Sequence, residues 1–136
     1  MPIAHFHVVD PTPGQQRRII EEATRIYAEA FDSDPERIRI FVQAYPATAV
    51  GVGGVLVSDG AAPAPFFTAL AMGGRPVQQR QRVLKEFTEM LVEVLGADRE
   101  SIRGRVVDIV PENWGIGGEP ASVLRAAEIA ARAESV

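Results

Sequence analysis

A proline follows the initiator methionine in this sequence, and its position gives the chain a candidate catalytic group. Removal of Met1, which is usual before a small side chain, would leave Pro2 as a secondary amine at the N-terminus. An α-amino group has an ordinary pKa of roughly 7.7–8, and burial or a nearby arginine would lower that pKa by disfavouring the cation. Pro2 could then act as a general base, or add to a carbonyl group, near neutral pH.

Other patterns that could support chemistry are weaker. His5 and His7 would share one face of a strand, but the sequence offers no evident third metal ligand. Asp32, Asp34 and Glu36 begin like a calcium-binding loop but lack its glycine and distal glutamate, so they indicate helix termination. Two Gly-x-Gly-Gly strings lack the lysine and the following helix of a phosphate-binding loop. We expect no metal, no nucleotide and no other cofactor.

An internal repeat determines where Pro2 lies in the fold. Gly53 and Gly117, the central glycines of the two Gly-x-Gly-Gly strings, are 64 residues apart, and the same offset aligns the Ile-Arg pairs at 38–39 and 102–103. Near the N-terminus the offset becomes 63 and aligns Pro2 with Pro65. Such self-similarity is the signature of tandem structural repeats. We therefore expect two copies of one unit, each beginning at a proline.

Each copy has the pattern of a strand, a helix and a second strand. Residues 3–9 and 66–72 have strand composition, and apolar residues recur at helical spacing from 15 to 31 and from 83 to 95. The long crossover implies parallel strands and a right-handed connection. One unit cannot cover its own sheet, so the two copies should form a four-stranded sheet with both helices on one face.

These elements predict an α/β (α+β) fold in one domain that is made of two repeats. The repeats span residues 1–57 and 65–119, with short hairpins at the Gly-rich strings, and 58–64 have the composition of a linker. Residues 120–136 are rich in alanine and should form a C-terminal helix.

Composition excludes several classes of function. A hydrophobic content of 46% with 24% charged residues predicts a packed globular core. The net charge of -4 provides no basic face for nucleic acid, and the absence of cysteine excludes disulfides and thiolate nucleophiles. No signal peptide or membrane-spanning run is evident, so we expect a cytoplasmic protein without a membrane partner.

The order of these features resembles the 4-oxalocrotonate tautomerase family of the tautomerase superfamily, in a fused, tandem-repeat form. The features are Pro2 directly before a strand, an amphipathic helix, an Ile-Arg strand and a Gly-x-Gly-Gly hairpin. In that family the N-terminal proline moves a proton on an enol or 2-oxo acid, and arginines bind the carboxylate. The resemblance implies a cofactor-independent keto–enol isomerase of a small 2-oxo or 2-hydroxydienoate acid. It also implies a homotrimer, because the small subunits of the family form hexamers.

The resemblance assigns different roles to the two copies. Pro2 matches the catalytic proline, whereas Pro65 is an internal amide without a basic lone pair. Arg75 matches the family's first-loop arginine, which the first copy lacks. The strand arginine occurs in both copies, and the hairpin aromatic residue occurs only in the second. The implied site has Pro2 as the general base and, as substrate-binding residues, Arg39, Arg75, Arg103 and Trp114.

Two alternatives remain open from the sequence. Hydration, dehalogenation or decarboxylation occur in the same superfamily and would need a carboxylate to activate water, for which Asp108 and Glu112 are candidates. Two strand-helix-strand repeats also describe ferredoxin-like binding or assembly modules without enzymatic activity. Only the free N-terminal proline separates such a module from an enzyme, and the arginines that face Pro2 depend on how chains pack.

Overall fold

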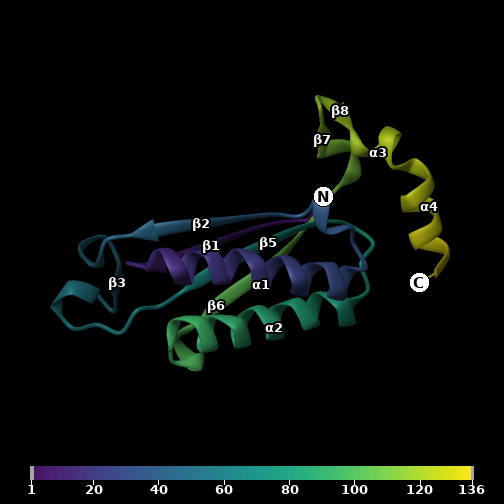
Figure 1. Ribbon diagram of the computed structural model, residues 1–136. Coiled ribbons are helices and arrows are strands. Elements are labelled where there is room, and N and C mark those ends of the chain that lie inside the picture. The colour runs from purple at the N-terminus through teal and green to yellow at the C-terminus, as the bar shows by residue number, and fades with distance from the viewer. Residues whose placement is uncertain (1, 136) are drawn as a thin grey trace.

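The computed structural model describes residues 2–135, and its main feature is a four-stranded sheet in the order β2-β1-β5-β6. Two long helices lie side by side across one face of this sheet (Figure 1). The strands are β1 (Ile3–Val9), β2 (Arg39–Tyr45), β5 (Phe66–Met72) and β6 (Arg103–Ile109), and the helices are α1 (Pro13–Phe31) and α2 (Val77–Leu95). β1 pairs in parallel with β2, and β5 with β6, while β1 and β5 are antiparallel. The predicted fold class is confirmed.

Smaller elements follow the second strand of each repeat. One hairpin contains β3 (Gly51–Val52) and β4 (Val55–Leu56), and the other contains β7 (Gly115–Ile116) and β8 (Glu119–Pro120). The C-terminal segment, expected as one helix, consists of α3 (Ala121–Leu124) and α4 (Ala126–Ser135), with a break at Arg125. No helix within residues 2–135 is both long and apolar enough to cross a membrane.

Local signals fix both ends of α1. Thr12 and Gln15 form a capping box, in which the Thr12 hydroxyl accepts from the Gln15 amide at 3.1 Å and the Gln15 side chain accepts from the Thr12 amide at 2.9 Å. Pro13 follows, with a φ angle already suited to a first helical turn. The helix ends at Phe31, and its C-cap, Asp32, has the left-handed conformation with φ 49°. The next turn, η1 (Pro35–Arg37), then leads directly into β2.

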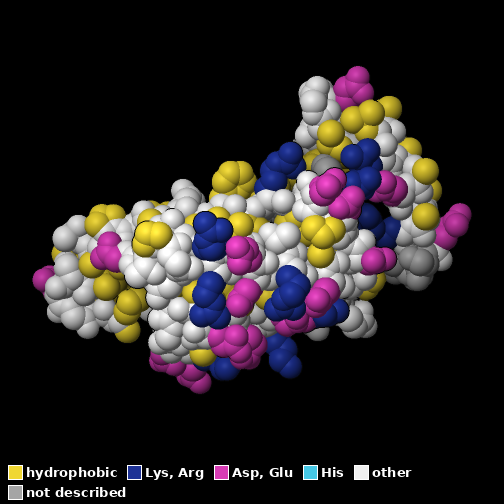
Figure 2. All heavy atoms as spheres, viewed as in Figure 1, with side chains coloured by type: hydrophobic (Ala, Val, Ile, Leu, Met, Phe, Trp, Pro, Cys, Tyr) yellow, Lys and Arg dark blue, Asp and Glu magenta, His cyan; other side chains and the backbone are white. Residues whose placement is uncertain are grey.

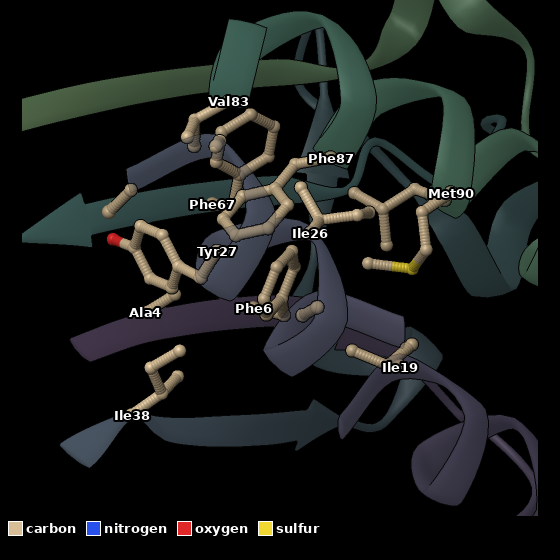
Figure 3. Close-up of a cluster of buried hydrophobic side chains, with 14 of the residues drawn as sticks. Ala4, Phe6, Ile19, Ile26, Tyr27, Ile38, Phe67, Val83, Phe87 and Met90 are labelled. Atoms are coloured by element: carbon tan, nitrogen blue, oxygen red, sulfur yellow. The ribbon is translucent and has the colours of Figure 1, made fainter. Parts of the chain in front are cut away.

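An aromatic cluster forms the core between the helices and the sheet (Figure 3). The ring of Phe87 makes edge contacts with Phe6, Tyr27 and Phe67, with centroids 5.0, 5.1 and 5.4 Å apart. All four residues are fully buried. Because β1, β5, α1 and α2 each contribute one ring, the same contacts join the two repeats.

Paired strand residues compensate for each other in size. In the first repeat Ala4 of β1 lies opposite Ile40 of β2, whereas at the equivalent place in the second repeat Phe67 of β5 lies opposite Gly104 of β6. A Cβ atom at Gly104 would overlap the Phe67 ring. The two repeats thus fill the same layer with a small–large pair and a large–small pair, which keeps the packing dense.

The other face of the sheet carries aromatic and charged side chains that the helices do not cover. His7 lies between Tyr45 and Phe66, with its Nδ1 2.7 Å from the Tyr45 hydroxyl. Partial burial, and secondarily the nearby His5, lowers the pKa of His7. Phe41 is 49% exposed on this face. We call this surface the open face.

The Gly104–Phe67 packing predicts that Gly104→Ala destabilises the fold by about 1–3 kcal/mol, because the added methyl group must displace a buried ring. Urea unfolding at fixed protein concentration measures the change. Gly115→Ala is the matched control, since no atom lies within 4 Å of a Cβ placed there. Equal stability of the two variants would contradict the packing argument.

Candidate active site

Antiparallel pairing of β1 with β5 places the two prolines at opposite ends of the sheet. The start of β1 lies beside the end of β5, as the pair Ile3–Leu70 shows. The amide of Arg39 donates to the carbonyl of Pro2 at 3.1 Å, and the amide of Arg103 donates to the carbonyl of Pro65 at 3.1 Å. Each repeat therefore has one proline at the beginning of its first strand, and each proline meets the other repeat's loops.

A pocket surrounds Pro2, which is buried. Its lining residues come from the turn after α1, from the end of β5 and the loop that follows it, and from α4. The lining residues are Pro2, Ser33, Asp34, Arg37, Ala71, Met72, Arg75, Glu128 and Arg132. Met1, whose removal would free the Pro2 nitrogen, lies outside the described residues.

Arg75 is anchored to the end of α1. Its Nη1 donates to the carbonyl of Phe31, its Nη2 donates to the Ser33 hydroxyl at 3.4 Å, and its guanidinium carbon lies 4.8 Å from the centre of the Phe31 ring. Burial, and secondarily the positive charge of Arg132, lowers the pKa of Arg75 to about 10. Arg75 therefore still carries its charge at neutral pH, in the same pocket as Pro2.

Tyr27 fixes the backbone beside Pro2 from inside the core. Its hydroxyl lies 3.1 Å from the carbonyl of Leu70 and 3.3 Å from the carbonyl of Ile3, and can donate to either. Burial raises the pKa of Tyr27, so its hydroxyl keeps the proton that these contacts need. The start of β1 and the end of β5 are thereby held together next to the pocket.

The other predicted site residues do not line this pocket. Arg39 begins β2 next to Pro2, but its side chain is exposed. Arg103 begins β6 at the opposite end, roughly 20 Å away along seven-residue strands that rise about 3.3 Å per residue. It borders a separate hollow with Val52 and Val55. Trp114 directly precedes β7 at the Pro2 end.

The pocket also contains residues that the sequence did not single out. Arg37 and Glu128 form an ion pair at 2.9 Å, which joins the turn before β2 to α4. Arg132, one turn further along α4, passes close to the loop before Arg75. The internal repeat could have indicated these residues. Residues 62–64 follow the first hairpin and lead to Pro65, and α3 and α4 follow the second hairpin at the equivalent point of the repeat.

The pocket at Pro65 has a different charge. Like Pro2, Pro65 is buried, but its pocket contains Asp10 and Asp98, and no arginine or lysine is among its described lining residues. Asp10 lies in the loop after β1, as Arg75 lies in the loop after β5. An anionic ligand would therefore be repelled at Pro65 and attracted at Pro2.

The carboxylates suggested for water activation lie elsewhere. Asp108 is exposed on β6 and Glu112 is exposed in the turn before β7, and neither lines the Pro2 pocket. The acidic residues of the pocket are Asp34, which accepts from the Glu36 amide at 3.0 Å, and Glu128, which is paired with Arg37.

A family model described as a tautomerase enzyme matches the chain twice, over residues 2–60 and 65–123. The chain belongs to the tautomerase family. Its 2-hydroxymuconate tautomerase relative from Comamonas testosteroni is 37% identical over 60 residues, which are 44% of this chain and 95% of that protein. The protein of the same name from Pseudomonas putida is 33% identical over 60 residues, with the same coverage. Each relative is about as long as one repeat, so this tautomerase-family member is a tandem form of such a chain.

Solved structures place the chain in the same family. Native fused 4-OT has a TM-score of 0.84 and 26% identity, and the match covers 90% of this chain and 98% of that one. The fused 4-OT designated F6, solved as an asymmetric trimer, has a TM-score of 0.81 with equal identity and coverage. These findings establish an isomerase-type enzyme and replace the alternative of a non-enzymatic module.

The contacts of Arg75 predict that Arg75→Gln lowers the free energy of unfolding by about 2 kcal/mol, because a charged hydrogen bond to a backbone carbonyl is lost. Urea unfolding at fixed protein concentration measures this loss. Arg17→Gln removes the same charge from an exposed position on α1 and should change stability by less than about 0.5 kcal/mol. A stable Arg75→Gln protein would show that the Phe31 contact is not structural.

Proposed function

We propose that this chain is a cofactor-independent tautomerase of a small 2-oxo or 2-hydroxydienoate acid, with Pro2 as its general base. The observation that carries the proposal is the burial of Pro2 in one pocket with Arg37, Arg75 and Arg132. Guanidinium groups favour a carboxylate ligand, which they bind through paired hydrogen bonds. Relatives named 2-hydroxymuconate tautomerase support a substrate of this class.

Proton transfer at Pro2 requires a neutral amine. Once Met1 is removed, burial and the neighbouring guanidinium groups both favour the uncharged nitrogen. This nitrogen takes the proton from the enol hydroxyl of the bound substrate, and the negative charge spreads over the resulting dienolate. The same nitrogen then delivers the proton to a carbon atom, which yields the keto form. Arg75, which keeps its charge in this pocket, stabilises the charge that develops on oxygen.

We propose further that three chains assemble, as in the fused 4-OT structure solved as a trimer. Assembly on the open face would cover exposed apolar side chains such as Phe41. It would also give Arg103 a role in a neighbouring chain's site, because Arg103 lies too far from Pro2 of its own chain to reach it. Arg39 and Trp114 remain proposed substrate-binding residues at the Pro2 end.

Pro2→Ala should lower kcat/KM for 2-hydroxymuconate or phenylenolpyruvate by about 100-fold, at the low end of what general acid–base catalysis contributes, because it replaces the ring amine with a primary amine that no ring holds in place. Spectrophotometric assays of enol disappearance measure the rate. Pro65→Ala is the matched control: it changes the equivalent proline of the other repeat, which has no free amine, and should retain wild-type activity.

The mature N-terminus is checked on the same samples by intact-mass measurement, which should show loss of Met1. Retained Met1 in a fully active protein would rule out the amine mechanism. Equal rates for Pro2→Ala and wild type would show that the ring nitrogen of proline is not required, although the variant would still carry a primary α-amine once Met1 is removed.

Sedimentation or light scattering should give three times the 14.7 kDa mass of one chain. Phe41→Glu should shift the protein toward smaller species, because a charge on the open face opposes burial between chains. A wild-type mass of one chain would contradict the proposed assembly and would leave Arg103 without a route to Pro2.

A further inference from the structure

Helix α4 forms one wall of the Pro2 pocket, although it lies beyond residues 2–60 and 65–123 that match the family. Figure 1 shows α4 approaching the end of the sheet where the chain begins, and Figure 2 shows charged side chains gathered where this segment meets the body. Glu128 and Arg132 supply the contacts of α4 with the pocket. A segment outside the family pattern thus contributes to the site.

The path of the chain explains why α4 reaches Pro2. In the first repeat the chain leaves hairpin β3–β4 and passes Ala62 and Pro63, which line the pocket of Pro65. In the second repeat the chain leaves hairpin β7–β8 at the equivalent point and continues into α3 and α4. Because the repeats are related by antiparallel pairing, the equivalent route leads to Pro2.

Arg75 cannot offer a full guanidinium to a substrate. Its Nη1 donates to Phe31 and its Nη2 donates to Ser33, while its Nε is buried without a protein partner. A carboxylate is bound best by two parallel N–H groups from one guanidinium. Arg75 therefore keeps at most one further N–H on each of its two Nη atoms, and a second arginine in the pocket would supply the paired N–H groups that a carboxylate prefers.

Arg132 is placed to supply the missing donors. Its Cδ lies 4.0 Å from where a Cβ atom of Gly74 would be, so the side chain runs along the loop that holds Arg75. It is half-buried and lines the pocket with Pro2. The positive charge of Arg132 helps to lower the pKa of Arg75. Two guanidinium groups this close repel each other, and a bound carboxylate between them would relieve that repulsion.

An ion pair holds α4 in this position. Arg37 Nη1 lies 2.9 Å from Glu128 Oε2, and the hydrogen bond from Arg37 lowers the pKa of Glu128, with further contributions from Arg125 and Arg132. Glu128 and Arg132 are one helical turn apart, so they lie on the same side of α4. Fixing Glu128 on the turn before β2 therefore also sets where Arg132 points.

We propose that Arg132 is a substrate-binding residue of the Pro2 pocket, where its guanidinium donates to the carboxylate of the 2-oxo acid. Glu128 and Arg37 are positioning residues, which act by docking α4. This inference rests on the proposed tautomerase function of Pro2 and deepens it. The carboxylate-binding group of this chain then comes partly from a C-terminal segment that the family pattern does not contain.

Steady-state kinetics with 2-hydroxymuconate and phenylenolpyruvate test the role of Arg132. Arg132→Gln should raise KM about tenfold with kcat within about twofold, because it removes charge-assisted hydrogen bonds from substrate binding. Arg17→Gln removes the same charge from an exposed site on α1 and should match wild type. The KM of Arg132→Lys should lie between those of wild type and Arg132→Gln. Glu128→Gln should raise KM by less than Arg132→Gln does.

Calorimetric titration of phenylpyruvate into Pro2→Ala, with and without Arg132→Gln, tests binding apart from catalysis. Arg132→Gln should weaken binding about tenfold on this background, with an unchanged thermal transition for the unliganded protein. Equal KM and equal binding for Arg132→Gln and Arg17→Gln would overturn the assignment. Full activity of Pro2→Ala together with weaker binding by Arg132→Gln would instead contradict the role of Pro2 as the base. The carboxylate-binding role of Arg132 would still stand.

Discussion

Antiparallel pairing of β1 with β5 is the constraint on which the site depends. It sets the two repeats head to tail, so the first residue of one repeat meets the loop that follows the first strand of the other. Pro2 and Arg75 are far apart in sequence, and this pairing brings them into one pocket. Tyr27 reinforces the arrangement, because its hydroxyl contacts the carbonyls of both strands next to Pro2.

The same pairing produces a second, equivalent pocket, and the two have diverged in charge. Three arginines line the Pro2 pocket with Asp34 and Glu128, whereas Asp10 and Asp98 lie beside Pro65. The core shows a parallel divergence, since Ala4–Ile40 and Phe67–Gly104 fill the same layer with opposite sizes. An internal proline has no basic nitrogen, so nothing in the chemistry requires an anion-binding shell around Pro65.

Much of this architecture was predictable from residue patterns. Strands at 3–9 and 66–72 have the predicted bounds, and α1 begins two residues before the predicted position because Thr12 caps it. The C-terminal helix was expected, but neither its break at Arg125 nor its docking through Glu128 was foreseen. Docking of this kind depends on contacts between side chains that are far apart in the sequence, such as Arg37 and Glu128, and these leave no periodic signal.

The sequence by itself determined the repeat, the strand-helix-strand order and the fold class, because these follow from local composition and spacing. Tertiary structure alone decided which cations meet Pro2. It placed Arg75 in the pocket, Arg39 on the open face and Arg103 at the far end of the sheet, and it added Arg132 from α4. Strand register and chain path set these distances, and both depend on contacts between segments that are remote in sequence.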